Sequence, residues 1–228
     1  PAWPLLAKAP AGDGRTVIIF PGLSANDATT IPLRRYLDHL GYRTEGWSQG
    51  FNFGPRAGVL ESARAQLVNA FNRSGQKVSL IGWSLGGVYA RELAKELPDM
   101  VRDVITLGTP FSGPPKSTNA WRVYELASGR TIDREVENYN LPEAPPVPTT
   151  SIYSRTDGIV AWQGSIQLPS QSNPDTENVE VIASHIGLGI NPGAWWVVAD
   201  RLAQPQGRWK PFARKGGLHG LVFPDPER

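Results

Sequence analysis

The sequence predicts an α/β protein: one domain over residues 1–228, with a doubly wound, mostly parallel six-stranded sheet and helices on both faces. Short apolar runs alternate with amphipathic helical patterns along the chain, an order typical of parallel strands joined by helical crossovers. The first run, at 16–20, lacks the in-and-out alternation of a half-exposed strand, which indicates burial on both faces. Neither an internal repeat nor a change in composition divides the chain.

The predicted strands and helices follow one another in a regular order. The helix after the first strand has apolar residues at helical spacing, with Pro32 near its start and Gly41 as its stop. The later elements rest on the same two patterns, apolar runs for strands and helical spacing for helices. The predicted strands are 16–20, 42–47, 78–81, 104–107, 151–153 and 179–182, and the predicted helices are 31–40, about 60–71, 85–97 and 194–203.

Two stretches depart from this alternation. Residues 111–149 separate the fourth and fifth strands and greatly exceed the usual connection of about 2 to 6 residues. We expect them to form a short, lid-like insertion that holds two short helices, at about 117–127 and 131–139. The tail from about 207 to 228 is rich in glycine, proline and charge, so we expect it to be loosely packed.

The composition excludes several classes of protein. Hydrophobic residues make up 40% of the chain and charged residues 19%, which excludes a disordered chain. A net charge of +2 is too small for a nucleic-acid footprint, and no apolar run approaches the roughly 18 residues of a membrane span. We expect a soluble protein, either cytoplasmic or secreted with its leader removed, since no signal peptide and no initiator Met is present. The oligomeric state stays open.

The chain has no cysteine, which excludes disulfides, thiolate nucleophiles, zinc–thiolate sites and iron–sulfur clusters. Its three histidines are His39, His185 and His219, so chemistry that depends on histidine has few candidates. We expect no metal and no organic cofactor. An oxygen-ligated calcium site stays open, because carboxylates and carbonyls suffice for it.

Two Gly-X-Ser-X-Gly pentapeptides occur, at 82–86 and at 46–50. Such a pentapeptide can form a nucleophile elbow, a strained strand-to-helix turn in which flanking glycines avoid a collision. Ser84 follows a buried strand and opens an amphipathic helix, whereas Ser48 follows a polar strand and leads into a loop at 51–56. Ser84 is therefore the candidate nucleophile, and we expect Ser48 to be a turn residue.

A serine hydroxyl needs a base that is itself oriented by an acid. In strand-to-helix hydrolases these partners follow in the order serine, acid, histidine. His185 comes directly after the last predicted strand, where active-site loops lie, whereas His219 lies in the glycine-rich tail. Asp157 follows the fifth strand, in an Asp-Gly pair that is also common in ordinary turns. The predicted catalytic residues are Ser84, His185 and Asp157, while His39 is expected to be solvated.

In this order the residues resemble the α/β-hydrolases, over 15 to about 205. The chain is similar to the compact bacterial lipases and esterases, and its Leu-Gly-Thr-Pro stretch is especially like the lipase branch. The resemblance implies acyl transfer to water by the triad, through an acyl-enzyme intermediate and without a cofactor. The stretches that carry it are 20–23, 82–87, 107–110, 154–158 and 184–185.

The resemblance also implies the donors of an oxyanion hole. One donor in that family is the backbone N–H of the residue after the nucleophile, here Leu85. The other comes from the loop after the first core strand, where lipases often have His-Gly and this chain has Pro21-Gly22. The match implies Leu23, with Ser24 as a competing assignment. A plain turn at the end of the strand is a further interpretation, and both can hold.

The substrate is less defined by the sequence. Trp121 in the insertion, Ile159 and Val160 after the acid and Ile186 after the base are predicted to line the substrate site, although Trp121 could equally pack against the sheet. These apolar groups favour a small-molecule or lipid ester of an acyl group, with lipase and short-chain esterase equally open. A thioesterase or a polyester depolymerase would use the same triad. A catalytically silent, hydrolase-like binding module is the alternative of another class.

Overall fold

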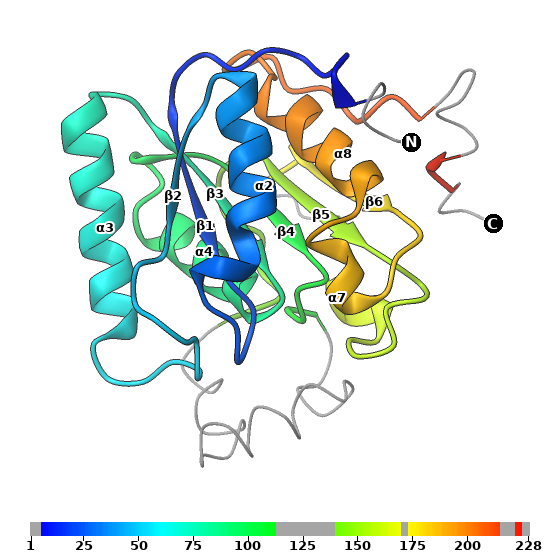
Figure 1. Ribbon diagram of the computed structural model, residues 1–228, viewed down its shortest axis with the longest axis horizontal. Coiled ribbons are helices and arrows are strands. Elements are labelled where there is room, and N and C mark those ends of the chain that lie inside the picture. Colours follow the sequence, from blue (N-terminus) through cyan, green and yellow to red (C-terminus); the bar gives the residue numbers. More distant parts are fainter. Residues whose placement is uncertain (1–5, 113–139, 170–172, 215–221, 225–228) are drawn as a thin grey trace.

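Six parallel strands form one sheet in the order β2-β1-β3-β4-β5-β6 (Figure 1). The computed structural model describes residues 6–112, 140–169, 173–214 and 222–224 of the chain. The parallel pairing of the six strands confirms the predicted sheet. The strands are β1 (Thr16–Phe20), β2 (Arg43–Gly46), β3 (Val78–Trp83), β4 (Val101–Leu107), β5 (Thr149–Tyr153) and β6 (Thr176–Glu180).

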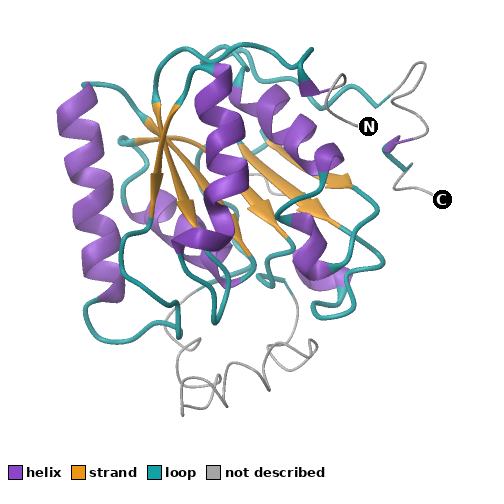
Figure 2. Ribbon diagram, viewed as in Figure 1, coloured by secondary structure: helices purple, strands orange, loops and turns teal. Residues whose placement is uncertain are grey.

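Helices cover both faces of the sheet, as Figures 1 and 2 show. Val17 and Ile19 of β1 belong to one core cluster, together with apolar residues of α2 and α8. Ile18 and Phe20 belong to the other cluster, with residues of α3 and α4, because side chains alternate between the faces of a strand. The helices are α2 (Asp27–Leu40), α3 (Val59–Ser74), α4 (Leu85–Glu96), α7 (His185–Leu188), α8 (Pro192–Leu202) and the short 3-10 helix η2 (Trp162–Ser165).

Helix α2 begins four residues before the predicted start at residue 31, so Pro32 lies inside the helix rather than at its first turn. The start is set by Asn26, whose side chain accepts a hydrogen bond from the Ala28 backbone N–H at 3.0 Å. Such a cap satisfies one of the free amides of the first turn. The helix ends at Gly41 as predicted, with φ of 103°.

Strand β6 also differs from the prediction, which placed it at 179–182. It lies at the edge of the sheet and pairs with β5 alone. An edge strand tolerates polar, half-exposed residues, so its Thr-Glu-Asn beginning carries no apolar signal. Strands β4 and β5 likewise begin earlier than predicted, at Val101 and Thr149.

The two short helices predicted at 117–127 and 131–139 lie outside the described residues, as do Trp121 and His219. The tail, which was predicted to be loosely packed, contributes the buried Phe212 and Phe223 to the first core cluster. At these positions the tail therefore packs against the domain. None of the helices in the described parts of the chain is long and apolar enough to cross a bilayer.

Candidate active site

Ser84 lies in the sharp turn between β3 and α4, near the middle of the sheet. Its φ of 53° and ψ of −125° are strained for a residue with a side chain, and such strain costs about 1 to 3 kcal/mol. The turn is held by a hydrogen bond from the Ser84 N–H to the Leu107 carbonyl at 2.8 Å. The serine side chain is thereby placed at the carboxyl edge of the sheet, and the residue is 8% exposed.

The glycines around this turn are required by close backbone contacts. A Cβ at Gly82 would lie 2.2 Å from the Cα of Gly87. A Cβ at Gly86 would lie 2.3 Å from the carbonyl oxygen of Phe20, at the end of the neighbouring strand. No real Cβ is tolerated at such distances, so the pentapeptide is fixed by the packing of α4 on β1 and β3.

The second pentapeptide has a similar strain but different surroundings. Ser48 has φ of 58°, so a positive φ does not separate the two serines. Ser48 is exposed and follows the edge strand β2, and its N–H donates to the carboxylate of Asp27 at 3.0 Å. Asp27 also accepts from the Trp47 N–H at 2.8 Å, so its carboxylate holds the turn. Ser48 therefore lies in the exposed loop that follows β2 and does not open a helix.

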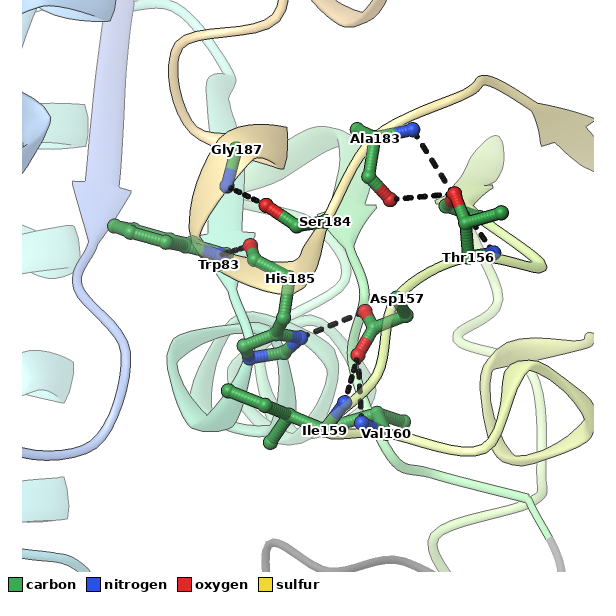
Figure 3. Close-up of polar contacts among 10 residues, drawn as sticks. Trp83, Thr156, Asp157, Ile159, Val160, Ala183, Ser184, His185 and Gly187 are labelled. Carbon is green, nitrogen blue, oxygen red and sulfur yellow. Dashed lines mark hydrogen bonds and ion pairs between the residues drawn. The ribbon is translucent and has the colours of Figure 1, made fainter.

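Asp157 and His185 meet at the carboxyl edge of the sheet (Figure 3). His185 Nδ1 lies 2.7 Å from Asp157 Oδ2, and both residues are buried. The backbone joins them as well, since the His185 N–H donates to the Asp157 carbonyl at 2.8 Å. The other carboxylate oxygen accepts from the N–H groups of Ile159 at 2.9 Å and Val160 at 2.6 Å. The carboxylate is therefore fixed on one side and faces the imidazole on the other.

A second buried carboxylate lies close by but has other partners. Glu180 Oε2 lies 3.2 Å from Arg155 Nε and accepts from the Tyr153 hydroxyl at 3.4 Å. Burial raises the pKa of Tyr153, so its hydroxyl keeps its proton and remains a donor. The Glu180 carboxylate thus binds Arg155 and Tyr153, whereas the Asp157 carboxylate binds His185.

Two residues next to the turn of Ser84 lie against the pair. A Cβ at Gly108 would lie 3.0 Å from Asp157 Oδ2 and 3.2 Å from His185 Nδ1, so this glycine leaves room for the pair. Trp83, next to Ser84 in the chain, has its ring 6.4 Å from the His185 ring. The segments at the ends of β3, β4, β5 and β6 therefore lie near one another, as expected of parallel strands.

The loop after β1 passes directly beside Ser84. A Cβ at Gly22 would lie 3.2 Å from the Ser84 Cβ. The Ser24 N–H donates to the Asn52 carbonyl at 2.7 Å, so it is not free to bind an oxyanion. Within the described residues, the N–H of Leu23 has no such backbone partner, so Leu23 remains the candidate of the two predicted donors, Leu23 and Ser24.

The predicted substrate residues are placed unequally. Ile159 and Val160 border the Asp157 carboxylate through their backbone, and the Val160 side chain is buried. Ile186 is exposed, directly after His185. Trp121 lies outside the described residues. The predicted roles of these side chains in binding substrate remain predictions.

Sequence reasoning missed several residues that hold the site together. Asn52 is fully buried in the loop at 51–56, and the Tyr89 hydroxyl of α4 donates to its side chain. Gly108 and the Trp83 indole were not assigned a role either. The sequence offers one weak signal, an asparagine between two aromatic residues in a loop of otherwise turn-forming residues. Within the described ranges, no group of three or more potential metal ligands from His, Cys, Asp and Glu occurs.

No protein-family model matches the sequence, and no curated protein matches it. By structure, the chain is similar to Aspergillus fumigatus lipase B, with a TM-score of 0.66 and 20% identity over 90% of this chain and 56% of that protein. The chain thus spans little more than half the length of that lipase. It is also similar to mouse alpha/beta hydrolase domain-containing protein 10 (TM-score 0.59, 17% identity, 84% and 89% covered). A third neighbour is the thioesterase domain from the curacin biosynthetic pathway (TM-score 0.56, 13% identity, 86% and 93% covered).

Proposed function

We propose that this chain, which has the α/β-hydrolase fold, is a serine hydrolase that cleaves carboxylic esters of acyl groups. The observation that carries the proposal is the 2.7 Å contact between Asp157 Oδ2 and His185 Nδ1 at the sheet edge where Ser84 stands in its strained turn. A carboxylate that holds Nδ1 orients the ring and leaves Nε2 for the nucleophile. This arrangement supports a triad of Ser84, His185 and Asp157.

In the proposed reaction, Ser84 Oγ attacks the ester carbonyl carbon and His185 Nε2 takes the hydroxyl proton. Asp157 stabilises the resulting imidazolium. The tetrahedral oxyanion accepts hydrogen bonds from the Leu85 and Leu23 N–H groups, each typically worth about 3 to 4 kcal/mol. His185 then gives its proton to the leaving alcohol, and the carbon–oxygen bond to that alcohol breaks.

The second half of the reaction releases the acyl group. Water attacks the acyl-enzyme carbonyl while His185 again accepts a proton, and the same two N–H groups stabilise the second oxyanion. The proton returns to Ser84 Oγ as the bond between acyl carbon and serine breaks. The products are a carboxylic acid and an alcohol, and the cycle needs no cofactor.

Exposed apolar side chains favour an acyl substrate over a charged one. Ile182, Ile186 and Ile190 are 62%, 67% and 59% exposed and lie four residues apart along the segment that carries His185. Large exposed apolar groups next to a candidate site support contact with an apolar ligand. The acyl chain of a lipid or small ester has this character.

A thioester substrate is the second candidate. One structural neighbour is a thioesterase domain, and the same triad and oxyanion donors serve thioester and ester carbonyls alike. The ratio of ester to thioester turnover decides between them, measured with acyl groups of equal length.

The test is hydrolysis of p-nitrophenyl esters from acetate to palmitate. We expect wild-type turnover that Ser84→Ala abolishes and Asp157→Asn lowers about 10⁴-fold, because the wrong imidazole tautomer then faces the serine. Ser48→Ala, in the second pentapeptide, is the matched control and should retain activity. A peak at long acyl chains would indicate a lipase, and a peak at short chains an esterase.

The proposal is contradicted if Ser84→Ala and Ser48→Ala hydrolyse the esters equally well. Strong turnover in Ser84→Ala would remove Ser84 as the nucleophile. A folded wild-type protein without turnover of any ester or thioester, and without labelling of Ser84 by a fluorophosphonate probe, would favour the silent binding module.

A further inference from the structure

We infer that Asn52 is a positioning residue for the oxyanion hole, because it fixes the position of the loop at 21–25 relative to helix α4. The inference rests on the proposed function, because it concerns the donors of that same site. Asn52 is 0% exposed, in the loop that follows the second Gly-X-Ser-X-Gly pentapeptide. It lies outside the triad, and its role follows from the groups it binds.

Three hydrogen bonds join Asn52 to the loop after β1. Its side-chain amide donates to the Pro21 carbonyl at 2.8 Å, at the start of the loop. Its backbone carbonyl accepts from the Ser24 N–H at 2.7 Å, and its backbone N–H donates to the Ala25 carbonyl at 2.8 Å. Both ends of the loop are therefore fixed by one residue, and the two residues between them, including Leu23, have little freedom to shift.

The remaining oxygen of Asn52 connects this loop to the nucleophile helix. Asn52 Oδ1 accepts from the Tyr89 hydroxyl at 3.1 Å and from the Gly54 N–H at 3.1 Å. Tyr89 lies one turn after Leu85 in α4. The Asn52 side chain therefore binds both the loop and the helix that carry the two proposed oxyanion donors. The Tyr89 ring is stacked on Trp47, with centroids 6.3 Å apart.

The second Gly-X-Ser-X-Gly pentapeptide, at 46–50, contributes to this arrangement through Trp47. Trp47 belongs to it, and the turn that follows is fixed by the bond from Trp47 Nε1 to the Gly50 carbonyl at 2.8 Å. The pentapeptide thus braces Tyr89 and leads the chain to Asn52. Trp47 therefore supports the proposed site through packing, and the cited contacts do not involve the Ser48 hydroxyl.

Only a carboxamide satisfies all the contacts of this side chain. Pro21 offers an acceptor, whereas Tyr89 and Gly54 offer donors, so the side chain must donate and accept at once. An aspartate of the same shape accepts but cannot donate to Pro21, and it places a negative charge near the developing oxyanion. Buried groups that lose their partner are costly, so the loop must move to recover one.

Movement of this loop matters because oxyanion stabilisation depends on fixed geometry. Gly22 already lies close to Ser84, because a Cβ added there would be 3.2 Å from the Ser84 Cβ. A shift of about 1 Å in a positioned group can cost about 100-fold in rate. Because the donor acts on the transition state, the loss should fall on kcat rather than on KM.

The test compares Asn52→Asp and Asn52→Ala with wild type, using p-nitrophenyl acetate and the inhibitor phenylboronic acid. The boronic acid forms a tetrahedral adduct with the serine oxygen and so probes the oxyanion hole. We expect kcat to fall about 10- to 100-fold with KM changed less than about 3-fold, and the inhibition constant to rise by a similar factor. The pH profile of kcat/KM of Asn52→Ala should keep its shape, because Asp157 and His185 are untouched and alanine adds no titratable group.

Tyr89→Phe keeps the inference testable if the Asn52 variants fail to fold. It removes one donor to Asn52 and retains the ring, so the same pattern is expected at about 3- to 10-fold. Ser48→Ala, in the same loop region, serves as the control with unchanged kinetics. Unchanged kcat in folded Asn52 variants, or in Tyr89→Phe when only that variant folds, would overturn the inference alone. If the wild-type protein has no turnover, or turnover that Ser84→Ala does not reduce, the proposed function and this inference are overturned together.

Discussion

The indole of Trp83 donates from Nε1 to the backbone carbonyl of His185 at 3.1 Å, and so ties the residue beside Ser84 to the residue that carries the imidazole (Figure 3). The two residues are 102 positions apart in the chain. Helix α7, which begins at His185, has only four residues and few hydrogen bonds of its own. The spacing between the turn that carries Ser84 and the residue that carries the imidazole is therefore set in part by one tryptophan.

Trp83→Phe should lower kcat/KM for p-nitrophenyl butyrate about 5-fold. The phenyl ring keeps much of the packing but loses a hydrogen bond worth about 1 kcal/mol, which frees the His185 backbone. Trp195→Phe is the matched control, since it removes a similar bond, from Trp195 Nε1 to the Gly189 carbonyl at 3.0 Å, at the far end of α7. Equal losses of kcat/KM in the two variants would contradict a specific role for Trp83.

Gly108→Ala should impair both stability and turnover. Gly108 has φ of 56°, and an added Cβ would lie 2.7 Å from Leu188 Cδ1 and 3.0 Å from Asp157 Oδ2. We expect the free energy of unfolding to fall by about 1 to 3 kcal/mol and kcat to fall about 10- to 100-fold, as the Asp157–His185 pair is displaced. Urea unfolding and ester hydrolysis measure the two effects.

Gly75→Ala separates backbone strain from the displacement of the pair. Gly75 ends α3 with φ of 64°, and a Cβ there meets nothing within 4 Å. This variant should lose about 1 to 2 kcal/mol of stability through strain alone and keep its kcat. If Gly108→Ala matched it in both measurements, Gly108 would have no specific relation to the proposed triad.

Asp103→Asn should change how stability depends on pH. Burial raises the pKa of Asp103 above its usual 3.8, although Arg15 opposes this effect. The folded state then keeps its proton at pH values where the unfolded chain has lost it, so stability falls as pH rises from the unfolded pKa through the folded one. The variant should lack this decrease and be more stable than wild type at neutral pH.

Urea unfolding between about pH 4 and pH 8 measures this dependence. The Asp103 side chain accepts from Ser79 Oγ at 3.1 Å, a bond that asparagine can keep through its carbonyl oxygen. Glu61→Gln, at an exposed position of α3, removes one negative charge from the surface and serves as the control. Identical pH dependence in wild type and Asp103→Asn would contradict the prediction.

Strand β3 and helix α4 were predicted well because each has a clear apolar pattern in its own sequence. The apolar run at 78–81 and the helix after it were placed within two residues of β3 and α4. Strand β6 was misplaced because its polar start depends on its position at the sheet edge, which no local pattern records. The start of helix α2 was predicted too late because the prediction relied on Pro32, whereas the structure places the cap at Asn26.

The sequence by itself determined the fold class and named Ser84, Asp157 and His185, because strand-end residues in a set order are a one-dimensional pattern. Tertiary structure decided how His185 and Asp157 meet and what surrounds them: their 2.7 Å contact, the space left by Gly108, and the Trp83 bond to His185. It also revealed Asn52, whose bonds join a loop after β1 to a helix after β3. Such contacts depend on distances between segments far apart in the chain, and residue order alone does not encode them.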